Sequence, residues 1–205
     1  MAARAPRPLP IWARPFDLAL IGFFLLNFFV ITYVVDIEQI TAPANPDPDG
    51  TRCEALREVV PWGAGGATVF GAWPTYPAWP PSQAVDIIRW YGCNFDPPLI
   101  ARAAWWRATI WSDSLLFGPF YAWAVWAYWV GNKAARLPTV AWACVIMTNV
   151  FVIMMEELDG STSTAFPVLV SALNAPWFFV PLAAAVRMAV QDNPFGASKP
   201  ATKTA

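Results

Sequence analysis

The stretch LALIGFFLLNFFVITYVV, residues 18–35, decides the class of fold. It contains no charge, and only Asn27 and Thr32 are clearly polar. A helix needs roughly 20 apolar residues to cross a hydrocarbon core about 30 Å thick. Three arginines precede the run, but it is long and ends in Val-Val-Asp without the small-residue cleavage site of a signal peptide. We therefore expect a retained membrane-spanning helix at about residues 16–36.

Three further apolar stretches follow at about residues 105–131, 137–156 and 166–188, each with a long uncharged run. Backbone polar groups in lipid have to be satisfied within the segment, so all of these stretches are expected to be helices. The chain is 57% apolar and 13% charged, which leaves too few charged residues to cover such helices in water. We therefore predict an all-α integral membrane four-helix bundle.

Charged residues are unequally distributed over the segments between these stretches. Basic residues prevail before the first span, in the turn with Lys133 and Arg136, and in the tail. Acidic residues prevail between the first two spans and after the third. The positive-inside rule then places both termini in the cytoplasm and the long loop between helices 1 and 2 in the lumen. The expected division is a cytoplasmic segment at 1–15, a membrane domain at 16–190 and a cytoplasmic tail at 191–205.

The loop between the first two spans is too long for a simple connector. Its part at about 42–84 is rich in Pro, Trp and Gly, as in WPTYPAWPP at 73–81, and such a sequence continues neither a helix nor a central strand. Tryptophan is favoured at membrane interfaces, so we expect a rigid interfacial cap. Cys53 and Cys93 lie on the expected lumenal side. In an oxidising compartment a disulfide between them is one alternative, and two free thiols are the other.

Several classes of function are excluded by composition. The chain has no histidine, which rules out His-based metal sites, Ser-His-Asp triads and an imidazole base. Its 13 basic and 14 acidic residues leave no basic excess for a nucleic-acid backbone. Neither a Gly-rich phosphate loop nor a Cys-x-x-Cys motif is present in the sequence. We therefore expect no metal, no cofactor and no nucleic-acid partner.

The residues that point to chemistry are carboxylates at membrane depth. Asp36 ends the first span, Asp113 lies about two turns into the second, and Glu156 and Glu157 end the third. Chain direction alone puts all four in the lumenal half of the bundle. A carboxylate inside a bilayer is costly and usually faces a cavity or a partner. Two acids in one apolar pocket can bind a cationic amine, or the protonated one can donate a proton to an alkene or epoxide.

For each acid a structural role is the alternative. Asp113 would then make an inter-helix hydrogen bond, and Asp36 and Glu157 would be solvated helix ends. Most tryptophans of the second span are expected to form the aromatic belt. Further candidates for the pocket are residues with a polar group or a ring on the second and fourth spans: Trp111, Tyr121, and Asn174 beside the kinking Pro176.

Four short motifs follow one another along the chain: a span ending in Asp36, WY at 90–91 before Asp-Pro at 96–97, Asp113 six residues before Pro119, and NAPWFFVP at 174–181. In this order they resemble the EXPERA superfamily, which includes the emopamil-binding sterol isomerase and the sigma-2 receptor. The resemblance covers roughly residues 14–40 and 85–190, and the insert at 42–84 has no counterpart in it.

The resemblance implies a function and a set of site residues. The receptor-like motifs imply Asp36 and Asp113 as pocket acids, and the isomerase-like motifs imply that Glu156, Asn174 and Trp177 line a sterol site. The implied function is binding of a sterol or another hydrophobic or cationic amphiphilic ligand. The alternative is a sterol or terpenoid isomerase or cyclase with Asp36, Asp113 and Glu156 as catalytic acids, although the isomerase's pocket histidine is missing. An endoplasmic-reticulum membrane and a role in lipid metabolism are also implied, and a homodimer is left open.

Overall fold

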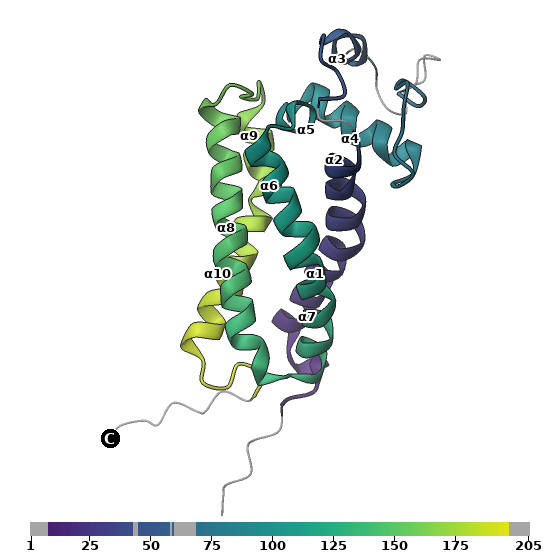
Figure 1. The fold of residues 1–205 in the computed structure, drawn as a ribbon. Coiled ribbons are helices and arrows are strands. Elements are labelled where there is room, and N and C mark those ends of the chain that lie inside the picture. Colours follow the sequence, from purple (N-terminus) through teal and green to yellow (C-terminus); the bar gives the residue numbers. More distant parts are fainter. Residues whose placement is uncertain (1–7, 43–44, 58, 60–68, 197–205) are drawn as a thin grey trace, which may run out of the picture.

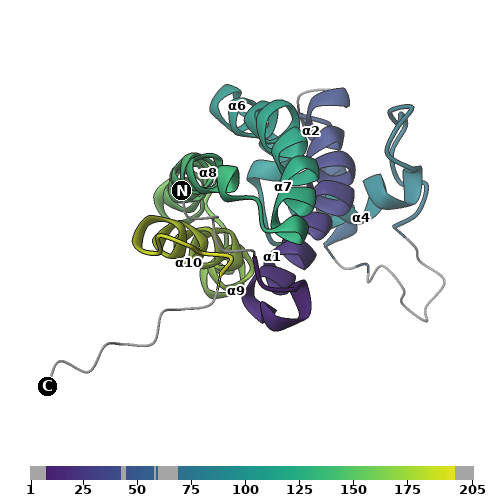
Figure 2. The same cartoon turned by 90° about the horizontal axis from the view of Figure 1, so that it is seen from below.

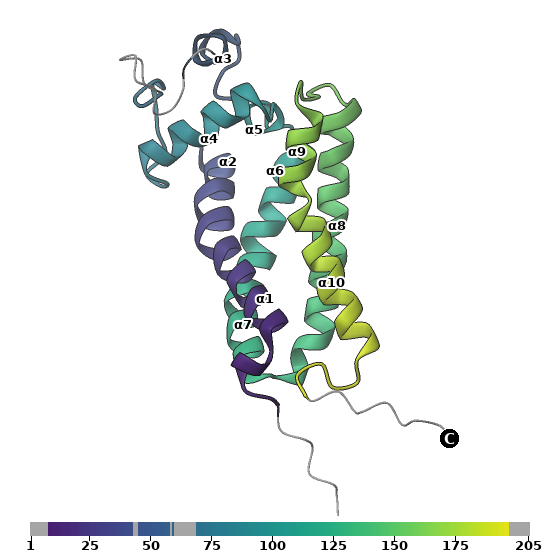
Figure 3. The ribbon, with the colours of Figure 1, turned by 180° about the vertical axis from the view of Figure 1, so that it is seen from behind.

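The computed structural model describes residues 8–42, 45–57, 59 and 69–196 of the chain. Across these residues every regular element is a helix, and no strand is present. The predicted all-α class is confirmed. Long helices stand side by side in two pairs, short helices lie across one end of them, and both described chain ends lie at the other end (Figures 1 and 3).

The first pair consists of two antiparallel helical stretches that pack along each other (Figures 1 and 2). One stretch is built from α1 (Pro15–Leu26), the π-helical η2 (Asn27–Asp36) and α2 (Ile37–Thr41). The other is built from α6 (Ala104–Ser112), the π-helical η3 (Asp113–Phe117) and α7 (Gly118–Val130). Phe24 lies fully buried between them, in ring contact with Tyr121 and Tyr128. Gly131, at φ +68°, ends α7 in the left-handed conformation that glycine adopts without strain.

The second pair consists of α8 (Arg136–Asp159) packed against α9 (Pro167–Asn174) and α10 (Pro176–Val190). The break between α9 and α10 falls at Ala175, directly before Pro176. Proline has no amide hydrogen to donate to the preceding turn, so the break lies where the sequence predicts a kink. The two pairs are joined mainly by aromatic side chains. Trp142 of α8 contacts the rings of Phe24 and Tyr121.

Three helical stretches are long and apolar enough to cross a membrane: Pro15–Thr41, Lys133–Asp159 and Pro167–Val190. They correspond to the first, third and fourth predicted spans. The predicted second span is also helical, from Ala104 to Val130, and lies alongside the first (Figure 1). Its six tryptophans and two tyrosines lower its mean hydropathy, although such rings are favoured near membrane surfaces. A fourth span and the placement of the termini remain predictions.

The short helices form a layer, which we call the cap, across the end of the bundle far from the described chain ends (Figures 1 and 3). It contains α3 (Thr51–Leu56), α4 (Ser82–Asn94) and α5 (Pro98–Ala101). A disulfide between Cys53 and Cys93 joins α3 to α4. Trp73 is buried in the cap, whereas the half-exposed Trp79 donates from Nε1 to the carbonyl of Tyr33 at 2.6 Å. The parts of the predicted insert at 43–44, 58 and 60–68 lie outside the described residues.

The opposite end of the bundle is held by a buried ion cluster. Arg14 donates from Nη1 to Asp17 at 2.8 Å, and Arg187 of α10 also pairs with Asp17. The Arg14 guanidinium further donates to the carbonyls of Tyr128 and Trp129, each at 2.9 Å. The cluster therefore ties α1, α7 and α10 together. The short 3-10 helices η1 (Ile11–Ala13) and η4 (Lys133–Ala135) turn the chain at this end.

Candidate functional site

The structure brings Asp36 and Asp113 together, as the topology of the sequence predicts. Asp36 ends η2 and Asp113 begins η3, so both acids lie at π-helical turns, which are frequent at functional sites. Their carboxyl groups lie close enough to interact electrostatically. Thr32 donates from Oγ1 to Asp113 Oδ2 at 2.5 Å, and the Tyr121 hydroxyl donates to Asp113 Oδ1 at 3.4 Å. Asp113 is thus held by several partners.

An aromatic floor supports this pair. Tyr121 is fully buried, and its hydroxyl accepts a hydrogen bond from Trp142 Nε1 at 3.3 Å. The Trp142 ring stacks on Phe120, with centroids 5.3 Å apart. Sequence reasoning did not assign Thr32 or Trp142 to the site. Thr32 lies one helical turn before Asp36, and this spacing predicts that both side chains are on the same face of the helix. No pattern distinguished Trp142 from the other tryptophans.

The surroundings of the pair limit its chemistry. Among the described residues, the side chains that contact Asp113 bring hydroxyl groups rather than positive charge. Two adjacent carboxylates in an apolar interior repel each other strongly unless a proton or a cation lies between them. The site can therefore hold a proton, or exchange it for the cationic group of a ligand.

Two other predicted residues lie elsewhere on the bundle. Trp177 donates from Nε1 to the buried Asn27 Oδ1 at 2.7 Å, which links α10 to the first helical stretch. Asn174 donates from Nδ2 to the carbonyl of Val170 within its own helix, at 3.0 Å. It lines an apolar groove of about 300 Å³ between α8 and the α9–α10 pair. Neither residue is hydrogen-bonded to the acid pair in the structure.

The predictions for Trp111 and Glu156 differ from the structure. Trp111 is 48% exposed on the outer face of α6 and does not line the site. Glu156 accepts hydrogen bonds from the Ser161 and Thr162 side chains and from the Thr162 amide, so it stabilises the turn after α8. Glu157, whose alternative reading was a solvated helix end, is instead fully buried. Neighbouring helical residues point about 100° apart, and here Glu157 faces inward whereas Glu156 faces the turn after α8.

The inward-facing Glu157 forms a second acid pair with Asp96, which precedes α5. Both carboxylate oxygens of Glu157 and Oδ1 of Asp96 are buried without a hydrogen-bond partner. Burial raises the pKa of Asp96. Burial, and then the negative charges of Asp96 and Glu157, raise the pKa of the nearby Tyr91 to about 12. We infer that at least one of these two buried carboxyl groups is protonated in the folded protein, where the cap meets α8.

This pair predicts a pH-dependent stability. Burial raises the pKa of Asp96 in the folded protein. Its contribution to the free energy of unfolding is therefore complete below the pKa of about 3.9 that the carboxyl group has in the unfolded chain, and it is lost as the pH rises through the folded-state pKa. The loss is at most about 1.4 kcal/mol per pH unit for one proton. Because the carboxyl group of Glu157 stays buried when Asp96 alone is replaced, the double variant Asp96→Asn/Glu157→Gln should remove this slope in thermal unfolding measured from pH 4 to 8. The exposed Asp192→Asn is the matched control, and an unchanged slope in the double variant would contradict a proton held by this pair.

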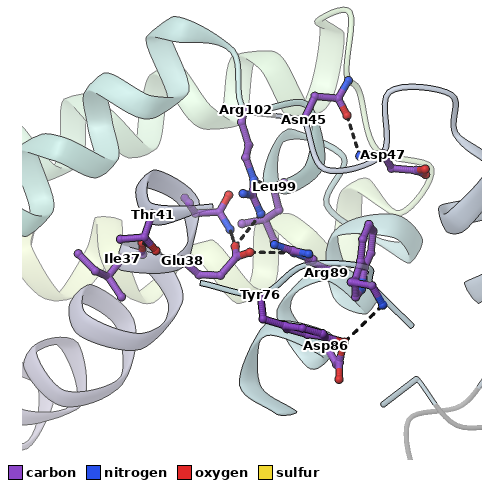
Figure 4. A network of polar contacts seen from close by, with 12 residues as sticks. Ile37, Glu38, Thr41, Asn45, Asp47, Tyr76, Asp86, Arg89, Leu99 and Arg102 are labelled. Carbon is purple, nitrogen blue, oxygen red and sulfur yellow. Dashed lines mark hydrogen bonds and ion pairs between the residues drawn. The ribbon is translucent and has the colours of Figure 1, made fainter. Parts of the chain in front are cut away.

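A buried ion cluster holds the cap over the end of the first helical stretch (Figure 4). Glu38 of α2 accepts from Arg89 Nε of α4 at 2.8 Å and from Arg102 Nη2 at 2.6 Å. Gln39 donates to the same carboxylate at 2.7 Å, and the Arg89 guanidinium lies 4.7 Å from the ring centroid of Trp73. Sequence reasoning counted Glu38, Arg89 and Arg102 only as loop charges. Their pairing fixes the cap two residues beyond Asp36.

Comparison with known proteins identifies the family. A model of the EBP family, described as EXPERA (EXPanded EBP superfamily), matches residues 84–188, which is just over half of the chain. The match contains Asp96, Asp113 and Glu157 but begins after Asp36 and Glu38. The chain is also similar to sigma intracellular receptor 2 of Xenopus tropicalis, at 27% identity over 82 residues.

That similarity covers 39% of this chain and 48% of the receptor. The chain thus spans about half the length of the curated relative it matches. The family match includes the helices from α4 to α10, apart from the first two residues of α4 and the last two of α10. With its apolar spanning helices and this match, the chain is an integral membrane protein that belongs to the EXPERA family.

Proposed function

We propose that this protein binds a sterol or another hydrophobic or cationic amphiphilic ligand, and that Asp36 and Asp113 are the counter-ions when the ligand carries a cationic group. The observation that carries the proposal is the pair of adjacent carboxyl groups at membrane depth, where Asp113 is contacted by hydroxyl donors. Family membership supports a sterol-related binding or isomerase function. A cationic group that replaces the shared proton would neutralise the pair and bring the apolar ligand body against the aromatic floor.

The two acids have different roles in this proposal. Asp113 is oriented by hydrogen bonds from Thr32 and Tyr121. Asp36, in turn, interacts with Asp113. Asp36 is therefore the main counter-ion, and Asp113 keeps it in place.

We further propose that Ala104–Val130 is a fourth span, that both termini are cytoplasmic and that the membrane is that of the endoplasmic reticulum. The basic turn at Lys133 and Arg136 supports this orientation.

A second candidate function is an isomerase or cyclase on a sterol or terpenoid. It is favoured by the aromatic side chains of Tyr121 and Trp142 next to the acids, because aromatic faces stabilise a carbocation. The protonated acid would give its proton to one alkene carbon, and the other carboxylate would take a proton from a neighbouring carbon. The double bond then moves without an oxidant or a reductant.

The test is ligand binding by the purified full-length protein in detergent, with a fluorescent tertiary-amine amphiphile as the probe. Asp36→Asn should weaken binding about thirtyfold or more, because loss of one partner of a buried charge pair costs about 2 kcal/mol or more. Asp113→Asn should weaken it as well. Asp159→Asn, at an exposed acid on the end of α8, is the matched control and should bind like wild type.

Incubation with sterols and terpenoid epoxides, followed by mass-resolved chromatography, separates the two functions. A product formed by wild type and lost in Asp113→Asn would establish the enzyme. Amine binding that depends on Asp36 without any product would favour the binding protein. If Asp36→Asn keeps its melting temperature and binds the amine with full affinity, the counter-ion assignment is wrong.

A further inference from the structure

A pocket of about 660 Å³ opens at the end of the bundle opposite the cap. It lies between the start of α1, the end of α10 and the segment that follows α10. Its lining includes Arg14, Phe16, Arg187, Gln191 and Asn193. This pocket is separate from the Asp36–Asp113 site, which lies near the other end of the same helices.

An apolar groove adjoins the pocket and shares Phe16, Arg187 and Gln191 with it. The groove has a volume of about 560 Å³ and follows the outer face of α10. Its other lining side chains are all apolar: Phe179, Leu182, Ala183, Val186 and Val190. The pocket that contains the two arginines and the apolar groove are therefore continuous along a helix that is apolar enough to span a membrane.

Two guanidinium groups, those of Arg14 and Arg187, line the pocket, and the carboxylates of Asp17 and Asp192 balance their charge. Arg14 and Arg187 share a single carboxylate, that of the fully buried Asp17. The exposed Asp192 also lines the pocket. Arg14 is 5% exposed, and its Nε is buried without a hydrogen-bond acceptor. The Nη groups of Arg14 donate to the carbonyls of Tyr128 and Trp129, so these bonds do not involve Nε or fill the pocket.

We propose that the pocket and the groove together bind one phospholipid with an anionic headgroup. The phosphate would accept hydrogen bonds from the Arg14 and Arg187 guanidinium groups, and one acyl chain would lie in the groove along α10. Phosphate oxygens are acceptors that suit guanidinium groups, and both arginines lie at ends of spanning helices, at the level of lipid headgroups. In the orientation proposed above this is the cytoplasmic leaflet, which contains the anionic lipids.

The test is retention of lipid by the full-length protein in native mass spectrometry from detergent. The probes are palmitoyl-oleoyl phosphatidylserine, phosphatidylcholine with the same acyl chains, and inorganic phosphate. Phosphatidylserine should bind at least about fivefold more tightly than phosphatidylcholine, which corresponds to about 1 kcal/mol for a basic side chain near the surface. Inorganic phosphate should not bind on its own.

Two variants locate the site. Ala183→Trp fills the groove and leaves every bond of Arg14 and Arg187 in place, so it should reduce phosphatidylserine retention at least fivefold. Ala141→Trp, at an exposed position on α8, is the matched control and should retain the lipid. Arg187→Gln should abolish the preference for phosphatidylserine. Its melting temperature is measured in parallel, because Arg187 also bonds to Asp17 and to the Pro194 carbonyl.

Three results would overturn the proposal. Equal retention of both phospholipids would show that the arginines do not select the headgroup. Binding of inorganic phosphate alone would indicate an anion site without an acyl chain. Full retention of phosphatidylserine by Ala183→Trp would place the lipid outside the groove.

Discussion

Replacing Glu38 by alanine should lower the free energy of unfolding by about 3–5 kcal/mol, because it removes the carboxylate that pairs with two buried guanidinium groups. Arg89 and Arg102 contact Glu38 at 2.8 and 2.6 Å, and all three side chains are at most 2% exposed. The cluster joins α2 to the cap, so the cap should detach first. Denaturant unfolding in detergent measures the total loss, and limited proteolysis reports on the cap.

Two comparisons test whether the charge is responsible. Replacing all three residues together with apolar side chains of similar size should cost far less than Glu38→Ala alone, because no unpaired charge then stays buried. Glu54→Ala, at an exposed acid in α3 of the cap, is the matched single control and should be near neutral. Wild-type stability of Glu38→Ala would contradict the role given to the cluster.

Removing the disulfide should destabilise the cap by about 4 kcal/mol. Cys53 and Cys93 are 40 residues apart, and a loop of that length loses about this much closure entropy on cross-linking in the chain-entropy account. The double variant Cys53→Ser/Cys93→Ser should make the cap sensitive to protease, while the long helices keep their far-ultraviolet helical signal.

The third cysteine provides the control for this experiment. Cys144 is exposed on α8 and is not part of a disulfide, so Cys144→Ser should behave like wild type. Treatment of wild type with a reductant should reproduce the double variant. A cap that stays equally resistant to protease in both cases would show that the ion cluster alone holds it.

The helices could be predicted from the sequence because uncharged runs of this length are informative without any tertiary context. All four predicted stretches are helical in the structure. Their ends were less predictable. The first was expected to end near Asp36, yet helical structure continues to Thr41. It continues because Glu38 is neutralised by Arg89 and Arg102, whose distance along the chain hides the pairing from local patterns.

The site was predictable only as far as chain direction determines it. Alternating spans place Asp36 and Asp113 at the same depth, and the structure brings them side by side. Chain direction does not determine how a helix is rotated about its axis. Glu156 and Glu157 are therefore equivalent in the sequence, and only the tertiary packing, which brings Glu157 next to Asp96, determines that Glu157 is the buried one.

The two ion clusters also determine how thick a bilayer this protein fits. Asp17 and Glu38 lie on one helical stretch, separated by about 30 Å at 1.5 Å per residue, which equals the thickness of an average hydrocarbon core. Arginines from other elements form ion pairs with both carboxylates, so the length of the apolar segment between them is fixed. A thicker membrane would therefore have to become thinner around the protein. Asp36 lies about 3 Å inside the boundary at Glu38, so the charged group of the proposed ligand would need to descend only about half a helical turn to reach it.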